Sequence, residues 1–297
     1  MDELKEEGNI SPSPPPKTNY LPWDPDFPHQ WQEFSDGCGA AAFAMVYGAL
    51  GHKASQNDIY KASTIPGIEG GKGSSPLTFL LNLDAILRGF HSLHVQVINP
   101  IEMLKDCYKH NIKVVVHQRS GPNSITGHAT VLVGISDEIV YMHCSANGPR
   151  QIYSYNEVLE RMAPFGVSDV GLGNALTLIS NPLTEKHTCK ECDKEIPEFI
   201  PCPNCAKAIR LSPCEPLGCI DSECSGHKWV DIYCPMCFKG IRQAEDRNEG
   251  EISPEEWPAV LKERQEKEEE RKKRIKEMFN FSKPTDNQLD KPTILND

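Results

Sequence analysis

The sequence predicts an α+β fold in which a helix carrying a reactive cysteine packs on an antiparallel sheet, with a small cysteine-rich unit after it. An Asp-Gly-Cys-Gly turn at 36–39 is followed by apolar residues at helical spacing. Helical patterns come first and β-rich runs dominate up to residue 179, an order typical of α+β domains. Repeated Cys-x-x-Cys pairs begin after residue 182 and indicate metal-bound thiols.

Composition narrows the class of protein. The chain has 297 residues, a net charge of −11 and 12 cysteines. The negative charge argues against a general nucleic-acid binder. The acidic start lacks the apolar segment of a signal peptide, and no run is long enough to span a bilayer. We therefore expect a cytoplasmic protein with reduced cysteines and no membrane partner.

Changes in composition divide the chain into five segments. A proline-rich start predicts a disordered arm, and a Ser-Pro-Glu-Glu capping box opens a late stretch dominated by Lys, Arg and Glu. The predicted segments are a disordered arm at 1–19, a first domain at 20–182, a zinc-binding domain that resembles a double zinc ribbon at 183–242, a charged helix at 253–279 and a disordered tail at 280–297.

Local signals place the elements of the first domain in order. Ser55 and Ser154 match helix caps, Pro76 lies in the first turn of a helix, and Gly89 ends it. A glycine-rich loop is expected at 66–73. The expected helices and strands are a helix from 38 to 50, helices at 56–62 and 76–88, a strand at 93–97, a helix at 100–110, a strand at 112–118, strands carrying His128 and Tyr141, a helix at 155–162 and a strand at 175–179.

Three residues carry the candidate chemistry. Cys38 lies at the predicted start of a buried helix, where unpaired N–H groups and the helix dipole favour the nucleophilic thiolate. Gln32 precedes it by six positions and could donate to an oxyanion beside the Cys38 N–H. His128 follows a glycine and begins a β-branched run, which predicts a general base at the exposed start of a strand. Other histidines, at 91, 94, 110 and 117, are predicted to be surface or core residues.

The blocks Gln…Asp-Gly-Cys-Gly-Ala-Ala-Ala-Phe-Ala-Met and Gly-His-Ala-Thr-Val-Leu-Val-Gly-Ile resemble the papain-like C39 cysteine peptidases. The resemblance covers about residues 20 to 180. It implies that Cys38 is the nucleophile, His128 the base and Gln32 the oxyanion donor. It also implies a peptide or protein substrate cleaved after small residues, often a double glycine.

The third catalytic residue departs from this family. Family members orient the histidine with an Asp, and Cys144 stands at the matching position. A thiol is a poor acceptor for an imidazole N–H, and Asn147 could supply a carbonyl instead. The sequence therefore predicts a cysteine peptidase. Two alternatives stay open: an adaptor with weakened catalysis whose zinc unit binds a protein partner, and a metal held by Cys38, His128 and Cys144.

The cysteine-rich unit predicts two structural zinc ions. Each Cys-x-x-Cys pair presents two thiolates, and two pairs complete a tetrahedron with no open position. Spacing favours the first two pairs in one site and Cys219 and Cys224 with the last pair in the other, while an interleaved arrangement remains an alternative. Cys214 and His227 are left without a role. The predicted ligands are Cys189, Cys192, Cys202, Cys205, Cys219, Cys224, Cys234 and Cys237.

Overall fold

The structure is a computed structural model that describes residues 23–64, 78–121, 124, 126–164, 173–182, 187–211 and 214–241. All of these residues belong to one compact unit, Met1–Glu245. The predicted arm, the glycine-rich loop at 66–73, the charged helix and the tail lie outside the described residues.

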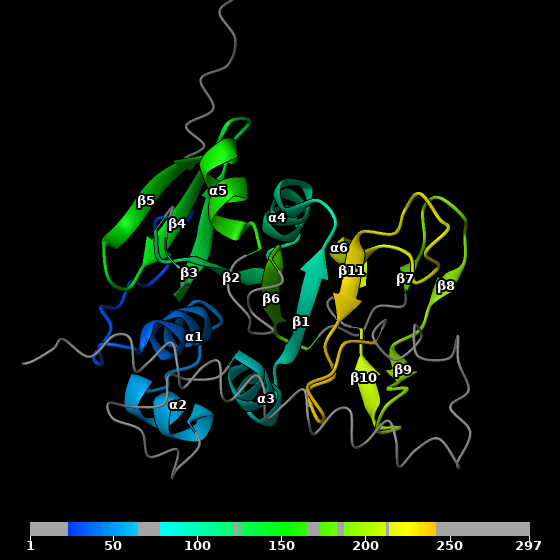
Figure 1. Cartoon of the computed structure of the whole chain (residues 1–297), viewed down its shortest axis with the longest axis horizontal. Helices are drawn as coiled ribbons and strands as arrows, with labels where there is room; N and C mark the ends of the chain where they lie inside the picture. The colour runs from blue at the N-terminus through cyan, green and yellow to red at the C-terminus, as the bar shows by residue number, and fades with distance from the viewer. Residues whose placement is uncertain are drawn as a thin grey trace, which may run out of the picture. The chain divides into compact units, whose positions relative to one another are not determined.

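A seven-stranded antiparallel sheet forms the centre of the unit, in the order β11-β1-β6-β2-β3-β4-β5 (Figure 1). This sheet, with helices packed on it, confirms the predicted α+β class. Its strands are β1 (His91–Val97), β2 (Lys113–Arg119), β3 (Gly127–Ile135), β4 (Ile139–Cys144), β5 (Gly148–Ser154), β6 (Ala175–Ser180) and β11 (Trp229–Ile232).

Helices cover both faces of this sheet. Val115 packs in a core with the first three helices, while its neighbours Val114 and Val116 pack in a second core with the next two. Figure 1 shows the two sets on opposite sides. None of the helices in the described segments is long and apolar enough to span a membrane. The helices are α1 (Cys38–Ala49), α2 (Gln56–Ser63), α3 (Thr78–Leu87), α4 (Pro100–Lys109) and α5 (Tyr155–Met162).

Helix α1 is buried on every side from Gly39 to Tyr47, as the sequence predicted for the helix that carries the cysteine. Its alanines leave room for neighbouring backbone, because each adds only a methyl group. The predicted caps are also present. Ser55 accepts a hydrogen bond from the Asp58 N–H at 3.1 Å, and Ser154 forms a reciprocal capping box with Glu157.

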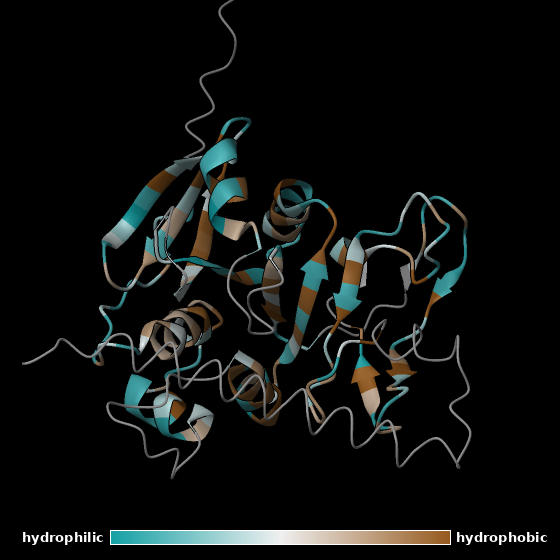
Figure 2. Cartoon of the chain, viewed as in Figure 1, coloured by the Kyte–Doolittle hydropathy of each residue, from teal (hydrophilic) through white to brown (hydrophobic). Residues whose placement is uncertain are grey.

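The cysteine-rich segment contains two short hairpins and then rejoins the sheet. Its last strand, β11, pairs with β1, and Val95 lies opposite Ile232. Figure 2 shows polar and apolar residues alternating along β1, which places Val95 on the α4 side and His94 on the α1 side. The boundary at residue 182 stays a prediction. The remaining elements are β7 (His187–Thr188), β8 (Glu195–Ile196), β9 (Phe199–Pro201), β10 (Ala208–Arg210) and α6 (Cys214–Leu217).

Candidate active site and metal-binding groups

Cys38, His128 and Gln32 line the same cavity of about 450 Å³. Cys38 is the first residue of α1, His128 is near the start of β3, and Gln32 lies in the segment that enters α1. Helix α1 packs on strand β3, and this packing brings Cys38 and His128 to the same cavity. The structure therefore brings His128 to Cys38 and Gln32, which lie about 90 residues earlier in the sequence, and unites the three residues that the sequence analysis selected.

The Cys38 side chain is partly buried, and its environment acts on the pKa of the thiol in two directions. Burial raises the pKa of the thiol and outweighs the N–H groups of Ala129 and Gly39, which lower it. The nearby Cys144 and Asp36 raise this pKa further. The start of α1 supplies a backbone N–H, as expected, but the net effect favours the neutral thiol rather than the predicted thiolate.

The His128 imidazole is also held in its neutral form. Burial lowers the pKa of His128, and the positive charge of Arg161 acts in the same direction. Nε2 lies 3.2 Å from the Sγ atom of Cys144. Nδ1 has no hydrogen-bond partner among the described residues. This ring nitrogen is therefore available to accept a proton.

Cys144 occupies the place in which the sequence analysis expected an oxygen acceptor. It is the last residue of β4 and only 1% exposed. The Asn147 backbone N–H donates to Cys144 Sγ at 3.2 Å, and its carbonyl accepts from Gln151 Nε2 at 3.2 Å. No contact in the described structure joins the Asn147 side chain to His128. The tight turn between β4 and β5 directs the backbone N–H of Asn147 toward the Cys144 sulfur.

Hydrogen bonds on both sides of its amide fix the orientation of Gln32. Its Oε1 accepts from the Ser145 hydroxyl at 3.1 Å, and its Nε2 donates to the Ser35 carbonyl at 3.0 Å. A carbonyl accepts only, so the nitrogen must face Ser35. One amide hydrogen of Gln32 is left for a group bound in the cavity.

His117 also lines this cavity, which the sequence analysis did not predict. Its Nε2 lies 2.9 Å from the Thr177 hydroxyl. The only signal in the sequence was a histidine inside an apolar strand, and a satisfied core histidine gives the same pattern.

Eight cysteines gather in two groups of four that could each hold a metal ion. Within each group all ligand atoms lie within 4.8 Å of one another. The groups are interleaved along the chain, so the alternative pairing is the one observed and the favoured pairing is wrong, because spacing alone does not determine which knuckles meet. The groups are Cys189, Cys192, Cys219 and Cys224, and Cys202, Cys205, Cys234 and Cys237.

The sulfur positions fit a tetrahedral metal. Four Sγ–Sγ distances between the knuckles are 3.7, 3.6, 3.6 and 3.7 Å. A zinc–sulfur bond of about 2.3 Å places tetrahedral ligands about 3.8 Å apart. These separations are far longer than a disulfide bond of about 2 Å. A group of Cys38, His128 and Cys144 is not among the metal-ligand clusters of the described residues.

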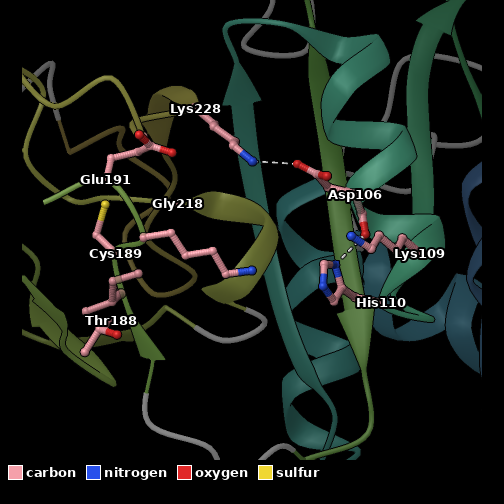
Figure 3. Close-up of a pocket in the computed structure, with 11 residues that line it drawn as sticks. Asp106, Lys109, His110, Thr188, Cys189, Glu191, Gly218 and Lys228 are labelled. Carbon is pink, nitrogen blue, oxygen red and sulfur yellow. Dashed lines mark hydrogen bonds and ion pairs between the residues drawn. The ribbon is translucent and has the colours of Figure 1, made fainter. Parts of the chain in front are cut away.

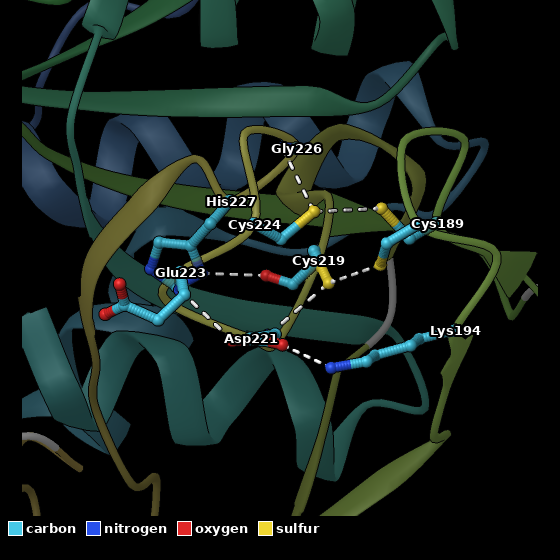
Figure 4. Close-up of polar contacts among 9 residues, drawn as sticks. Cys189, Lys194, Cys219, Asp221, Glu223, Cys224, Gly226 and His227 are labelled. Carbon is cyan, nitrogen blue, oxygen red and sulfur yellow. Dashed lines mark hydrogen bonds and ion pairs between the residues drawn. The ribbon is translucent and has the colours of Figure 1, made fainter.

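Backbone groups and side chains around the first cysteine group support it (Figure 4). The Glu191 N–H leads the effects that lower the pKa of Cys189 to about 7, which favours a metal-binding thiolate. Lys194 forms an ion pair with Asp221. His227 donates from Nδ1 to the Cys219 carbonyl at 2.8 Å, which places it beside the group and outside the set of four ligands.

A second, polar cavity of about 320 Å³ separates α4 from the first cysteine group (Figure 3). Lys228 crosses toward α4 and pairs with Asp106 at 2.5 Å. Lys109 and Glu191 add charges of opposite sign to the wall. None of the residues that line it belongs to the Cys38 cavity.

No protein-family model matches the sequence, and no curated protein matches it significantly. Several solved structures, among them the following three, are similar at low identity. A C39-like peptidase from Bacillus anthracis is 13% identical, with a TM-score of 0.41, over 54% of this chain and 96% of its own. The peptidase domain of Streptococcus ComA, a bi-functional ABC transporter involved in a quorum-sensing pathway, is 15% identical, with a TM-score of 0.40, over 52% and 99%. A double glycine motif protease from an AMS/PCAT transporter, solved with its leader peptide, is 14% identical, with a TM-score of 0.36, over 52% and 91%.

Proposed function

We propose that this protein is a cysteine peptidase in which Cys38 attacks a peptide carbonyl. The observation that carries the proposal is the single cavity that joins Cys38, His128 and an oriented Gln32 amide. Nucleophile, base and oxyanion donor are the three groups that thiol-dependent acyl transfer requires.

The reaction begins with two neutral partners. Cys38 transfers its proton to Nδ1 of His128 as the sulfur attacks the carbonyl carbon, and the carbonyl oxygen becomes an oxyanion. The free hydrogen of the Gln32 amide and the backbone N–H of Cys38 stabilise that oxyanion. His128 then returns the proton to the leaving amine, and a thioester remains on Cys38. His128 next takes a proton from a water molecule whose oxygen attacks the thioester carbon. The carbon–sulfur bond breaks, the acid is released, and the proton returns from His128 to the Cys38 sulfur.

Cys144 replaces the carboxylate that would orient the base. Its sulfur lies 3.2 Å from His128 Nε2 and receives the Asn147 N–H at 3.2 Å, so the sulfur is held in place by the β4–β5 turn. A neutral thiol fixes the orientation of the ring but stabilises the imidazolium less than a carboxylate does. We therefore expect a slower enzyme than one with an aspartate at this position.

The substrate class follows from the resemblance in sequence and from the cavity wall. Family members cleave after small residues, often two glycines. Here four residues with small side chains contribute to the wall of the cavity that contains Cys38, which would suit a substrate with small residues. These residues are Gly39, Gly127, Ala129 and Ala146.

Each group of four cysteines is proposed to hold one zinc ion. Four thiolates fill a tetrahedral zinc completely, so no position is left for substrate, and the role of the metal is to stabilise the fold.

Cys38→Ala tests the peptidase proposal. Zinc-loaded full-length protein is incubated with a peptide carrying two glycines before a fluorogenic amide, and release of the fluorophore is measured. We expect turnover by the wild type and a loss of at least about 1,000-fold in the variant. Cys107→Ala is the matched control, because Cys107 lies on the buried face of α4 and does not line the cavity. Equal turnover by wild type and Cys38→Ala would refute the proposal.

One observation favours a second candidate function. Because the environment of the site favours a neutral thiol and a neutral imidazole, the same fold would suit an adaptor that binds peptides without cleaving them. Peptide binding by the wild type, without turnover and without any thioester on Cys38 by intact-mass analysis, would support this function instead.

A further inference from the structure

The wall of the Cys38 cavity contains a second histidine that the proposed reaction does not use. His117 lies on β2, two residues beyond Val115, and therefore faces the α1 side of the sheet with it. Thr177 on β6 and His94 on β1 lie on the same side. The three form a polar row across neighbouring strands β2, β6 and β1.

Short contacts connect the row. Nε2 of His117 lies 2.9 Å from Thr177 Oγ1, and Nδ1 of His94 lies 3.0 Å from the same oxygen. The two rings are 5.0 Å apart and nearly perpendicular, at 87°. A hydroxyl has one hydrogen to donate and two lone pairs, so Thr177 can bond both rings at once, and at most one ring accepts from it. The row thus fixes the orientation of both rings.

Burial keeps the row uncharged. His117 is 4% exposed, His94 is 5% exposed and Thr177 is fully buried. Burial lowers the pKa of His94 to about 4, and burial together with the His94 ring lowers the pKa of His117 well below its usual value. Both imidazoles are therefore neutral in the physiological range, and each has one N–H and one lone pair.

The second nitrogen of His117 is exposed to the cavity. Nδ1 has no hydrogen-bond partner among the described residues, yet it is not one of the fully buried polar atoms that lack a partner. Since the residue lines the cavity and its Nε2 is turned to Thr177, we place Nδ1 at the cavity surface.

The far end of the row is anchored by the cysteine-rich segment. Tyr233 donates its backbone N–H to the His94 carbonyl at 3.0 Å, and its ring lies 5.1 Å from the His94 ring. His94 is thus held between β6 and the residue that precedes Cys234. A row fixed at this end resists rotation of His117 at the other.

We propose that His117 is a substrate-binding residue, which presents Nδ1 as an oriented hydrogen-bonding group to the backbone of a peptide lying beside Cys38. A peptide backbone offers both N–H and C=O groups, so either tautomer of His117 finds a partner. This inference rests on the proposed function, because it assigns the substrate contact of the same cavity.

One substitution separates the roles of the two nitrogens of His117, and a second substitution, at His94, serves as its control. In His117→Gln the side-chain amide reaches the position of Nε2 and keeps the Thr177 contact, but nothing replaces Nδ1. His94→Asn is the matched control, since its amide keeps the contact to Thr177 at the other end and lies outside the cavity wall. Both are made in a Cys38→Ala background, so that the uncleaved double-glycine peptide can be titrated with zinc-loaded full-length protein.

We expect the peptide Kd to rise about 3- to 10-fold in His117→Gln, the effect of one lost hydrogen bond, and to change less than twofold in His94→Asn. The midpoint of thermal unfolding is measured for each, so that a loss of folding is recognised. In the proteins that retain Cys38, iodoacetamide labelling of the thiol should be the same with and without His117→Gln. An unchanged Kd in His117→Gln, an equal rise in both variants, or no peptide binding at all would overturn the inference.

This design also separates the two proposals. Peptide binding that depends on His117 without turnover by the wild type would refute the peptidase and retain the substrate contact. Turnover that depends on Cys38, with the same KM in wild type and His117→Gln, would retain the peptidase and refute the contact.

Discussion

Replacing Cys144 by aspartate should convert the resting site from neutral partners to a thiolate–imidazolium pair. The variant carboxylate would lie beside Nε2 of His128, where Cys144 Sγ now lies 3.2 Å away. The Asn147 N–H that donates to the sulfur is in place to donate to the carboxylate. A negative charge there favours the protonated ring, and a protonated His128 in turn favours the Cys38 thiolate.

The expected size of the effect follows from the short distance between residue 144 and the His128 ring. Two unit charges about 4 Å apart interact by about 4 kcal/mol at an effective dielectric constant of about 20. Cys144 is 1% exposed, so desolvation of the carboxylate offsets part of this energy. A net effect of about 2 kcal/mol corresponds to roughly 30-fold more thiolate in the acidic range.

The assay is iodoacetamide labelling of Cys38 between pH 5 and 10, quantified by peptide mass spectrometry. In the wild type the rate should rise through the alkaline range without an acidic plateau, since the pKa of Cys38 is raised and that of His128 is lowered. Cys144→Asp should label roughly 30-fold faster at pH 6, while the neutral control Cys144→Ser should not. A folded Cys144→Asp protein with wild-type labelling at pH 6 would refute the assigned contact between residue 144 and His128.

Two further predictions concern the metal groups and the buried row. Full-length protein should contain two zinc ions by elemental analysis. The double variant Cys189→Ser/Cys202→Ser should lose both ions, because the two cysteines belong to different groups. Retention of one ion would instead indicate that the first two Cys-x-x-Cys pairs share a single site. Since the folded-state pKa of His94 is about 4 against 6.5 for the free side chain, its contribution to stability is complete above pH 6.5 and is lost as the pH falls toward 4. The free energy of unfolding is measured with urea at pH 7 and at pH 4. Between these two values the wild type should lose about 3 kcal/mol more than His94→Gln. Equal losses in the two proteins would contradict a buried, neutral His94.

The sequence located the residues whose local pattern carries the chemistry. A cysteine in a glycine turn before a helix and a histidine at the start of a β-branched strand are recognisable because the local backbone positions the side chain. The cysteine at position 144, in place of the family's aspartate, could also be recognised from the sequence, because it stands at the end of a strand pattern. These patterns predicted the antiparallel sheet and the buried helix α1.

The remainder depends on contacts between distant segments. The sequence cannot tell whether the Asn147 amide or its backbone N–H faces the site, because a tight turn decides it. It cannot tell which cysteine pairs meet, because three of the four pairs share the same Cys-x-x-Cys spacing and local spacing does not select a partner. His117 resembles any histidine in a core strand until Thr177, 60 residues later, is found beside it. Strand β11 has only four residues, too few for a periodic signal.

The position of β11 has a consequence for the metal-free protein. This strand covers the free edge of β1 opposite Val95 and Gln96, and the ligands Cys224 and Cys234 flank it along the chain. If chelation releases these ligands, β11 is no longer held at either end. The backbone groups of β1 that face β11 then lose their partners, while those that face β6 keep theirs. An uncovered strand edge pairs readily with another chain. If the proposed zinc ions are bound at these groups, their removal is expected to cause self-association through β1, so that the metal would prevent aggregation as well as stabilise the fold.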